Sequence, residues 1–206
     1  MLITTLMMAT RPPHDTKVSA KELAEMLHLP DPESAGSRRV NKAFADLQEN
    51  ELVRRERNPG HVPSTVVLFP GGGGEEWDDT KLQEGYITLP IELWERGWIV
   101  TLSGTAIALL VILRELTGGR SAPRGIYVEA HRKREYGLSD DTWTKGTKEL
   151  REAGLLRIIE EVETSRGEPR RRNLHTLLLD NLKNYHPGEV PEDAAAASEP
   201  VGPHFE

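Results

Sequence analysis

The sequence predicts an α+β chain, mainly α, made of two small domains. Its 206 residues are 37% hydrophobic and 5% aromatic, which is lean for one thick core and fits two small ones better. Residues 70–79 join four glycines to a run of acids, the composition of a flexible linker. The expected parts are an N-terminal domain at 1–69, a linker at 70–85, a C-terminal domain at 86–183 and a disordered acidic tail at 184–206.

The first half predicts three helices followed by a hairpin. Ser19 and Glu22 have the spacing of a capping box at a helix start. Apolar residues at Val40, Ala43, Phe44 and Leu47 follow the i, i+3, i+4, i+7 pattern of a helix with one buried face. The expected elements are helices at 2–10, 18–29 and 37–50, with a turn-rich break at 30–36, and strands at 52–57 and 64–69.

The second half predicts a similar series. Residues 101–116 form a helix that is apolar on most faces, capped by Ser103. It is either the core of its domain or part of an oligomer interface, and the second alternative would make the protein a homodimer. Residues 126–138 are expected to be helical. A further helix starts at Ser139 and ends at Gly154, a strand runs to about Thr164, a basic loop spans 165–173, and a last strand covers 174–179.

The two halves also resemble each other in sequence pattern. Residues 47–53 match 150–156 at an offset of 103, and 65–69 match 175–179 at an offset of 110. Each half resembles a winged helix-turn-helix domain, the second over about 102–180. The resemblance implies that the helix after the turn enters the major groove of DNA, while the hairpin wing touches phosphate or the minor groove.

The net charge of −7 is unevenly distributed. Residues 71–85 carry −4 and residues 184–206 carry −5, so the remaining 168 residues carry +2. A local basic patch can bind phosphate whatever the net charge of the chain. The composition is therefore compatible with a nucleic-acid partner.

The third helix of the first half supplies the best candidates for reading DNA. Val40 and Phe44 face the core, so the polar residues around them point outward. Arginine and lysine contact guanine or phosphate, asparagine contacts adenine, and a hydroxyl at a helix start suits a phosphate. The alternative is a solvated helix face. The predicted contacts here are Ser37, Arg38, Arg39, Asn41 and Lys42.

Arginines on the following strand extend this candidate surface. Arg54 and Arg55 enter the first wing, and solvated charges are the alternative to phosphate contacts there.

The second half offers a weaker helix and a more basic wing. Aspartates at 140 and 141 stabilise the helix start but repel phosphate. Trp143, in the position of Val40, is expected in the core, and Lys133 stands in the place of Ala24. The predicted helix contacts are Thr142, Thr144, Lys145 and Lys148, and the predicted wing contacts are Arg166, Arg170, Arg171 and Arg172. The alternatives for the wing are contact with a protein, contact with the acidic tail, or no contact. The tail could also compete with DNA for the arginines of the wing.

Other classes of function find little support in the sequence. The chain has no cysteine, which excludes disulfides and thiolate metal sites, and its seven histidines lack metal-ligand spacing. No nucleophile or nucleotide-binding motif occurs, and acids rather than Lys-Ser/Thr follow the glycine run. We expect no enzyme activity, cofactor, metal or small-molecule ligand. The longest apolar run is far shorter than a membrane span, so we expect a cytoplasmic, nucleoid-associated protein.

These observations predict binding to double-stranded DNA, as a sequence-specific transcriptional regulator. One alternative is a plasmid or phage replication or partition factor, since tandem winged helices on one chain also resemble plasmid replication initiators. A second alternative is a protein-interaction adaptor, because winged helices also serve as docking modules.

Overall fold

The chain forms two compact units, Met1–Glu84 and Gly85–Glu206, in a computed structural model. The structure describes residues 1–71, 73–78, 80, 86–165 and 168–189. The expected tail beyond residue 189 and Arg166 in the second wing lie outside these residues. In the described part of the chain, no helix is long and apolar enough to cross a membrane.

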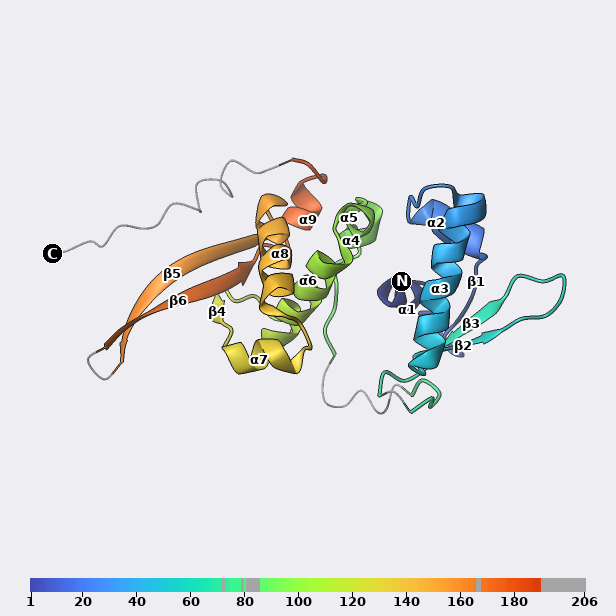
Figure 1. The fold of residues 1–206 in the computed structure, drawn as a ribbon, viewed down its shortest axis with the longest axis horizontal. Coiled ribbons are helices and arrows are strands. Elements are labelled where there is room, and N and C mark those ends of the chain that lie inside the picture. The colour runs from blue at the N-terminus through green and yellow to red at the C-terminus, as the bar shows by residue number, and fades with distance from the viewer. Residues whose placement is uncertain (72, 79, 81–85, 166–167, 190–206) are drawn as a thin grey trace. The chain divides into compact units, whose positions relative to one another are not determined.

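The first unit is a small α+β assembly (Figure 1). Its three strands form an antiparallel sheet in the order β1-β3-β2. The core is made by Leu23, Ala24, Val40, Phe44 and Val53, which join two helices to the first strand of the hairpin. The elements are α1 (Leu2–Met8), β1 (Asp15–Lys17), α2 (Ala20–Met26), the π-helical turn η1 (Pro32–Gly36), α3 (Ser37–Glu49), β2 (Val53–Glu56) and β3 (Ser64–Val67).

The second unit is also α+β, with strand order β4-β6-β5. Its core includes Leu109 and Leu113 of α6, Leu150 of α8 and Leu182 of α9. The elements are α4 (Glu92–Glu95), α5 (Trp98–Thr101), α6 (Gly104–Leu116), β4 (Ile126–Tyr127), α7 (Ala130–Glu135), α8 (Asp140–Glu152), β5 (Leu156–Ser165), β6 (Glu168–Leu177) and α9 (Asn181–Asn184).

The packing of α6 against α8 is close. A Cβ at Gly146 would lie 3.2 Å from both Leu109 Cδ2 and Thr105 Cγ2, so glycine lets the two helices approach. Glu149 ties the helices together further, because its carboxylate accepts hydrogen bonds from the Ser103 N–H, at 2.6 Å, and from the Ser103 hydroxyl. The predicted N-cap Ser103 is confirmed: its Oγ accepts from the Ala106 N–H at 3.2 Å.

Both units contain one order of elements: helix, strand, helix, helix, strand, strand. The first unit adds η1 between its paired helices, and the second adds α4 and α5 before the series and α9 after it. In each sheet the first strand pairs with the third, and the third with the second. The backbone repeats locally as well. Glu51 (φ 54°) and Gly154 (φ 70°) both follow the second helix of the pair in the left-handed conformation, and His28 (φ 49°) and Gly137 (φ 68°) both follow the first. The weak sequence similarity therefore corresponds to a repeated topology.

Two predicted elements were wrong, and one strand was not predicted. Residues 126–138 are not one helix, because Ile126 and Tyr127 pair with His175 and Leu174 as strand β4. Apolar β-branched and aromatic residues favour a sheet over a helix start. The short strand β1 was missed for lack of any apolar run. The expected loop at 165–173 is largely strand, since β6 begins at Glu168 and carries the arginines in register with β5.

The expected linker at 70–85 is partly folded onto the first unit. The Phe69 N–H donates to the Glu75 carbonyl at 2.9 Å, and Leu68 and Glu76 form an antiparallel bridge. Trp77 then lies beside His14, with ring centroids 5.4 Å apart. Partners for the indole and the carboxylates thus order a stretch whose composition alone predicts flexibility. We call residues 73–78 the strap.

Candidate nucleic-acid interface

Three cations lie on the outward side of the first half of α3. Arg38, Arg39 and Lys42 are exposed, while Val40 and Phe44 are buried on the opposite side. The Arg38 guanidinium donates to Ser34 Oγ at 2.9 Å. Among the described residues, the Arg39 and Lys42 side chains have no hydrogen-bond or ion-pair partner. Residues three apart on a helix are neighbours, so these two can act on one ligand.

Ser37 does not offer the expected phosphate site. The turn η1 runs directly into α3, so Ser37 lies inside a continuous helical stretch rather than at its start. Its hydroxyl donates to the Pro32 carbonyl. Amides of the preceding turn are also bonded: Gly36 N–H to the Asp31 carbonyl at 2.7 Å and Ala35 N–H to Asp31 Oδ2 at 3.1 Å.

Arg55 and Asn41 meet each other inside the unit. Arg55 is 9% exposed, its guanidinium carbon is 4.3 Å from the centroid of the Phe44 ring, and it donates to Asn41 Oδ1 at 3.0 Å. Burial, with a smaller contribution from Arg57, lowers the pKa of Arg55. Strand alternation places Arg55 on the buried face beside Val53. Neither residue is presented to a large partner in this arrangement.

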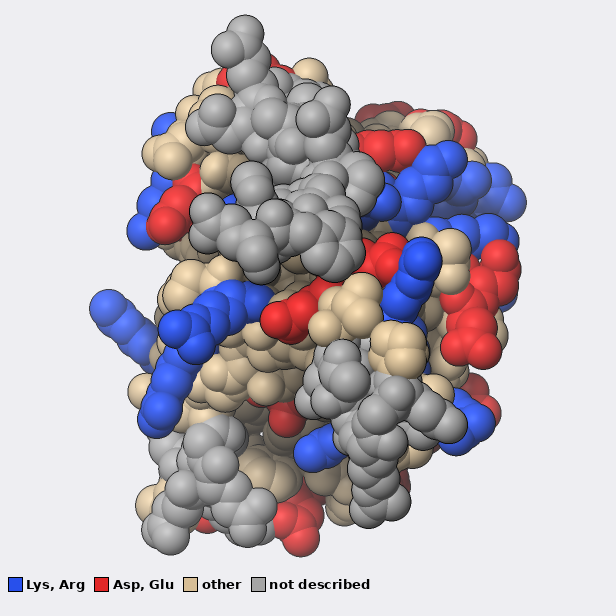
Figure 2. Space-filling model, turned by 90° about the vertical axis from the view of Figure 1, so that its left-hand side faces the viewer, with Lys and Arg blue, Asp and Glu red and all other residues tan. Residues whose placement is uncertain are grey.

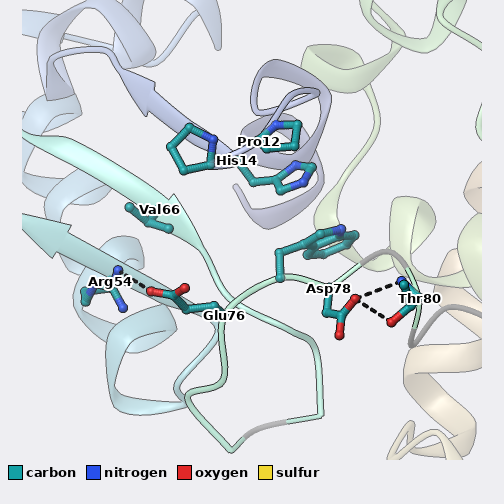
Figure 3. A pocket seen from close by; sticks show the side chains of 9 residues that line it. Pro12, His14, Arg54, Val66, Glu76, Asp78 and Thr80 are labelled. Atoms are coloured by element: carbon teal, nitrogen blue, oxygen red, sulfur yellow. Dashed lines mark hydrogen bonds and ion pairs between the residues drawn. The ribbon is translucent and has the colours of Figure 1, made fainter.

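Arg54 points the other way, to the outer face of the sheet, where it meets acids. Its guanidinium lies 3.3 Å from Glu76 of the strap (Figure 3). It also lies 3.6 Å from Glu56. These contacts neutralise much of its charge.

A cavity of about 470 Å³ opens beside this ion pair. Val66 of β3, the loop before β1 and the strap form its walls, and Asp78 there accepts hydrogen bonds from the Thr80 N–H at 2.9 Å and hydroxyl at 2.6 Å (Figure 3). The cavity is open, and it lies where the strap packs against the sheet. No local sequence pattern predicts it, because its lining comes from four separated segments of the chain.

The side chains of the four candidate DNA-contacting residues on α8 form hydrogen bonds or ion pairs with other residues of the helix or its N-cap. Lys145 pairs with Asp141 at 2.7 Å and Lys148 with Glu152 at 3.7 Å. The Thr144 hydroxyl donates to the Asp140 carbonyl at 2.8 Å. The Thr142 hydroxyl lies 2.8 Å from the hydroxyl of the N-cap Ser139. Exposed pairs of this kind are weak and can exchange for another partner, but they distinguish Lys145 and Lys148 from Arg39 and Lys42 of α3.

The second wing is a long hairpin formed by β5 and β6 (Figure 1). Most of its acids are on β5, and most of its bases are on β6. Arg172 lies directly opposite Glu161 in the register, and Arg171 pairs with Glu160 at 3.1 Å. The Arg172 guanidinium also lies over Tyr127, 4.8 Å from the ring centroid. The backbone of Arg170 is part of β6, but its side chain is outside the described set. Figure 2 shows basic and acidic side chains interspersed on the face that it presents. The described part of the wing is therefore close to neutral.

Sequence reasoning missed a buried cluster behind α8. Trp143 is 4% exposed, which confirms its predicted core position, and its ring meets His175 edge-on with centroids 6.2 Å apart. The Lys133 ammonium lies 5.0 Å from the Trp143 centroid. Burial lowers the pKa of His175, and the charge of Lys133 contributes in the same direction. The lysine in the place of Ala24 thus packs against an aromatic ring, which accommodates it at a core position.

Comparisons with protein-family models, curated proteins and solved structures found no match to this chain. Within the described residues, no group of three or more histidines, cysteines or carboxylates could hold a metal ion.

Proposed function

We propose that this protein binds double-stranded DNA through two winged helix-turn-helix units, with α3 of the first unit as the principal contact. The proposal makes α2 and α3 a helix-turn-helix pair and the β2–β3 hairpin its wing. The corresponding elements of the second unit are α7, α8 and the β5–β6 hairpin.

The observation that carries the proposal is the repeated order of elements together with the free cations of α3. Two sheets with the same strand order, each following a helix pair, support the winged-helix interpretation. In that arrangement the N-terminal half of the second helix contacts base edges. Arg38, Arg39 and Lys42 lie in that half, whereas Asp46 and Glu49 lie near the other end. This distribution favours insertion of the first half of the helix into the major groove.

A selection of bound sequences from random duplex DNA tests the proposal. The full chain is compared with an Arg39→Ala/Lys42→Ala variant and with a matched Lys145→Ala/Lys148→Ala control on α8. We expect the α3 variant to lose roughly 1–3 kcal/mol for each base contact removed, and to lose sequence preference. The control should retain most of its binding, since those lysines are already paired within the helix.

Salt dependence supplies a second readout. For each phosphate contact, the log–log slope of the binding constant against salt concentration should be about −0.9. Absence of any enriched sequence at moderate salt, or an α8 variant as defective as the α3 variant, would count against the proposal.

The biological role follows from where the selected site occurs. Sites in promoters would support a transcriptional regulator, the role that we favour. Repeated sites at an origin would support a plasmid or phage replication or partition factor.

A protein-interaction adaptor is the second candidate, and one observation favours it. The candidate lysines of α8, and Arg171 of the second wing, form ion pairs with nearby acids, which suits a surface that meets protein rather than a polyanion. An adaptor would show no steep salt dependence with duplex DNA and no enriched sequence.

A further inference from the structure

The outer face of the second sheet carries an apolar row. Tyr127 and Ile159 lie on either side of Leu174 in the strand register. Residues directly opposite one another in an antiparallel sheet share a face, so the three side chains form one row. The neighbouring row contains Ile158 and the buried His175, which face the helices. Tyr127 is 44% exposed and Ile159 is 36% exposed, so the apolar row faces outward.

The fold does not require this row to be apolar. The corresponding row in the first unit is aligned across β1, β3 and β2 in the same way, and it consists of Lys17, Ser64 and Glu56. All three are polar. The second unit therefore exposes apolar surface at a place where its structural repeat does not.

An arginine flanks the apolar row on each side. The Arg172 guanidinium lies over Tyr127, and Arg157 is two residues before Ile159 on the same face. Arg157 is half-buried and donates to the Pro123 carbonyl at 3.3 Å, but its Nε is buried without a hydrogen-bond partner. A third flanking residue, Glu161, is acidic and lies opposite Arg172. The face therefore favours an acidic occupant over a second copy of itself, which would bring its own arginines.

The first unit shows which kind of segment occupies this side of a sheet. Its strap follows β3 closely in the chain, is acidic and contains Trp77. Glu76 of the strap pairs with Arg54, which precedes Glu56 by two residues just as Arg157 precedes Ile159. An acidic segment with an aromatic residue is thus the occupant that the repeat indicates for the second unit.

We propose that residues 190–206 of the same chain bind the outer face of the second sheet, over Tyr127, Ile159 and Leu174. The segment contains four acids, no lysine or arginine, and one aromatic residue, Phe205. Its acids complement Arg157 and Arg172, and Phe205 complements the apolar row. Its 17 residues can span roughly 55 Å when extended, well beyond the dimensions of a domain of about 100 residues. The proposal is independent of DNA binding.

A nitroxide label in the segment tests the contact. The chain has no cysteine, so Ser198→Cys provides a single attachment site in the full-length protein. We expect the amide signals of Tyr127, Ile159 and Leu174 to lose more than half of their NMR intensity in the labelled protein. Amides on the exposed side of α8 should be unaffected.

Two full-length controls carry the same label. In the first, Glu192→Gln, Asp193→Asn and Glu199→Gln neutralise three of the four acids; in the second, Ile159→Thr removes part of the apolar row. Both should recover much of the lost intensity. Uniform weak broadening, broadening centred on another surface, or no recovery in either control would overturn the proposal.

Mixing distinguishes a contact within one chain from a contact between copies. Labelled protein without isotope is added to isotope-labelled protein without nitroxide. Our proposal predicts no loss of signal in the mixture. A loss of the same signals in the mixture would assign the face to a second copy and overturn the intramolecular contact.

Discussion

Acidification should destabilise the second unit through His175. Burial lowers the pKa of this histidine in the folded protein, and Lys133 adds to the effect. The unfolded chain therefore binds the proton first as the pH falls below about 6.5, the ordinary value for histidine. The contribution of His175 to stability is complete above that pH and is lost as the pH falls toward the folded pKa. Over this window, the free energy of unfolding should fall by up to about 1.4 kcal/mol per pH unit.

Urea unfolding between about pH 8 and about pH 5 measures this dependence. A Trp77→Phe background leaves the fluorescence of Trp94, Trp98 and Trp143, all in the second unit. The matched variant is His175→Thr, because threonine occupies the corresponding buried position, Thr65, in the first unit. The variant loses packing at every pH, so only the difference in pH dependence is informative. Parallel curves for the two proteins across this range would refute the linkage.

Three further predictions concern local geometry. Glu51→Gly should stabilise the first unit by up to about 1 kcal/mol in urea unfolding, because glycine relieves the left-handed backbone at φ 54°; a loss of stability would contradict this. Glu149→Ala should cost the second unit roughly 1–2 kcal/mol by removing both hydrogen bonds from Ser103, and an unchanged unfolding midpoint would show that the contact is dispensable. Burial and then the hydrogen bond to Glu115 raise the pKa of Tyr136 to about 12, so an ultraviolet titration should show one late phenol that shifts down in Glu115→Gln.

The fold class was predictable because its signals are local. Capping residues marked the starts of α2, α6 and α8, and the pattern of Val40 and Phe44 marked the buried side of α3. The α+β class with small antiparallel sheets is confirmed. The short strands β1 and β4 were not predictable, because their pairing with β3 and β6 is decided by tertiary contacts rather than by any local run.

The candidate site was harder to predict, because the sequence shows which side chains are charged but not which residues they pair with or pack against. Arg39 and Lys42 lie exposed as expected, but Arg55 turns inward onto Phe44 and Asn41. No local pattern distinguishes an arginine that will be buried from its exposed neighbour. The sequence predicts a basic loop at 165–173, and only the register of β5 and β6 reveals the glutamates opposite its arginines.

The ten-residue strand β5 has a consequence for handling the protein. It lies at the edge of its sheet, so its outer backbone groups could template pairing with another chain. Glu160 and Glu161 near its middle would place like charges together if two such edges met in antiparallel fashion. This protection depends on the negative charge of the two side chains. A Glu160→Gln/Glu161→Gln variant should therefore be more prone to sheet-rich aggregation in concentrated samples than the unchanged protein.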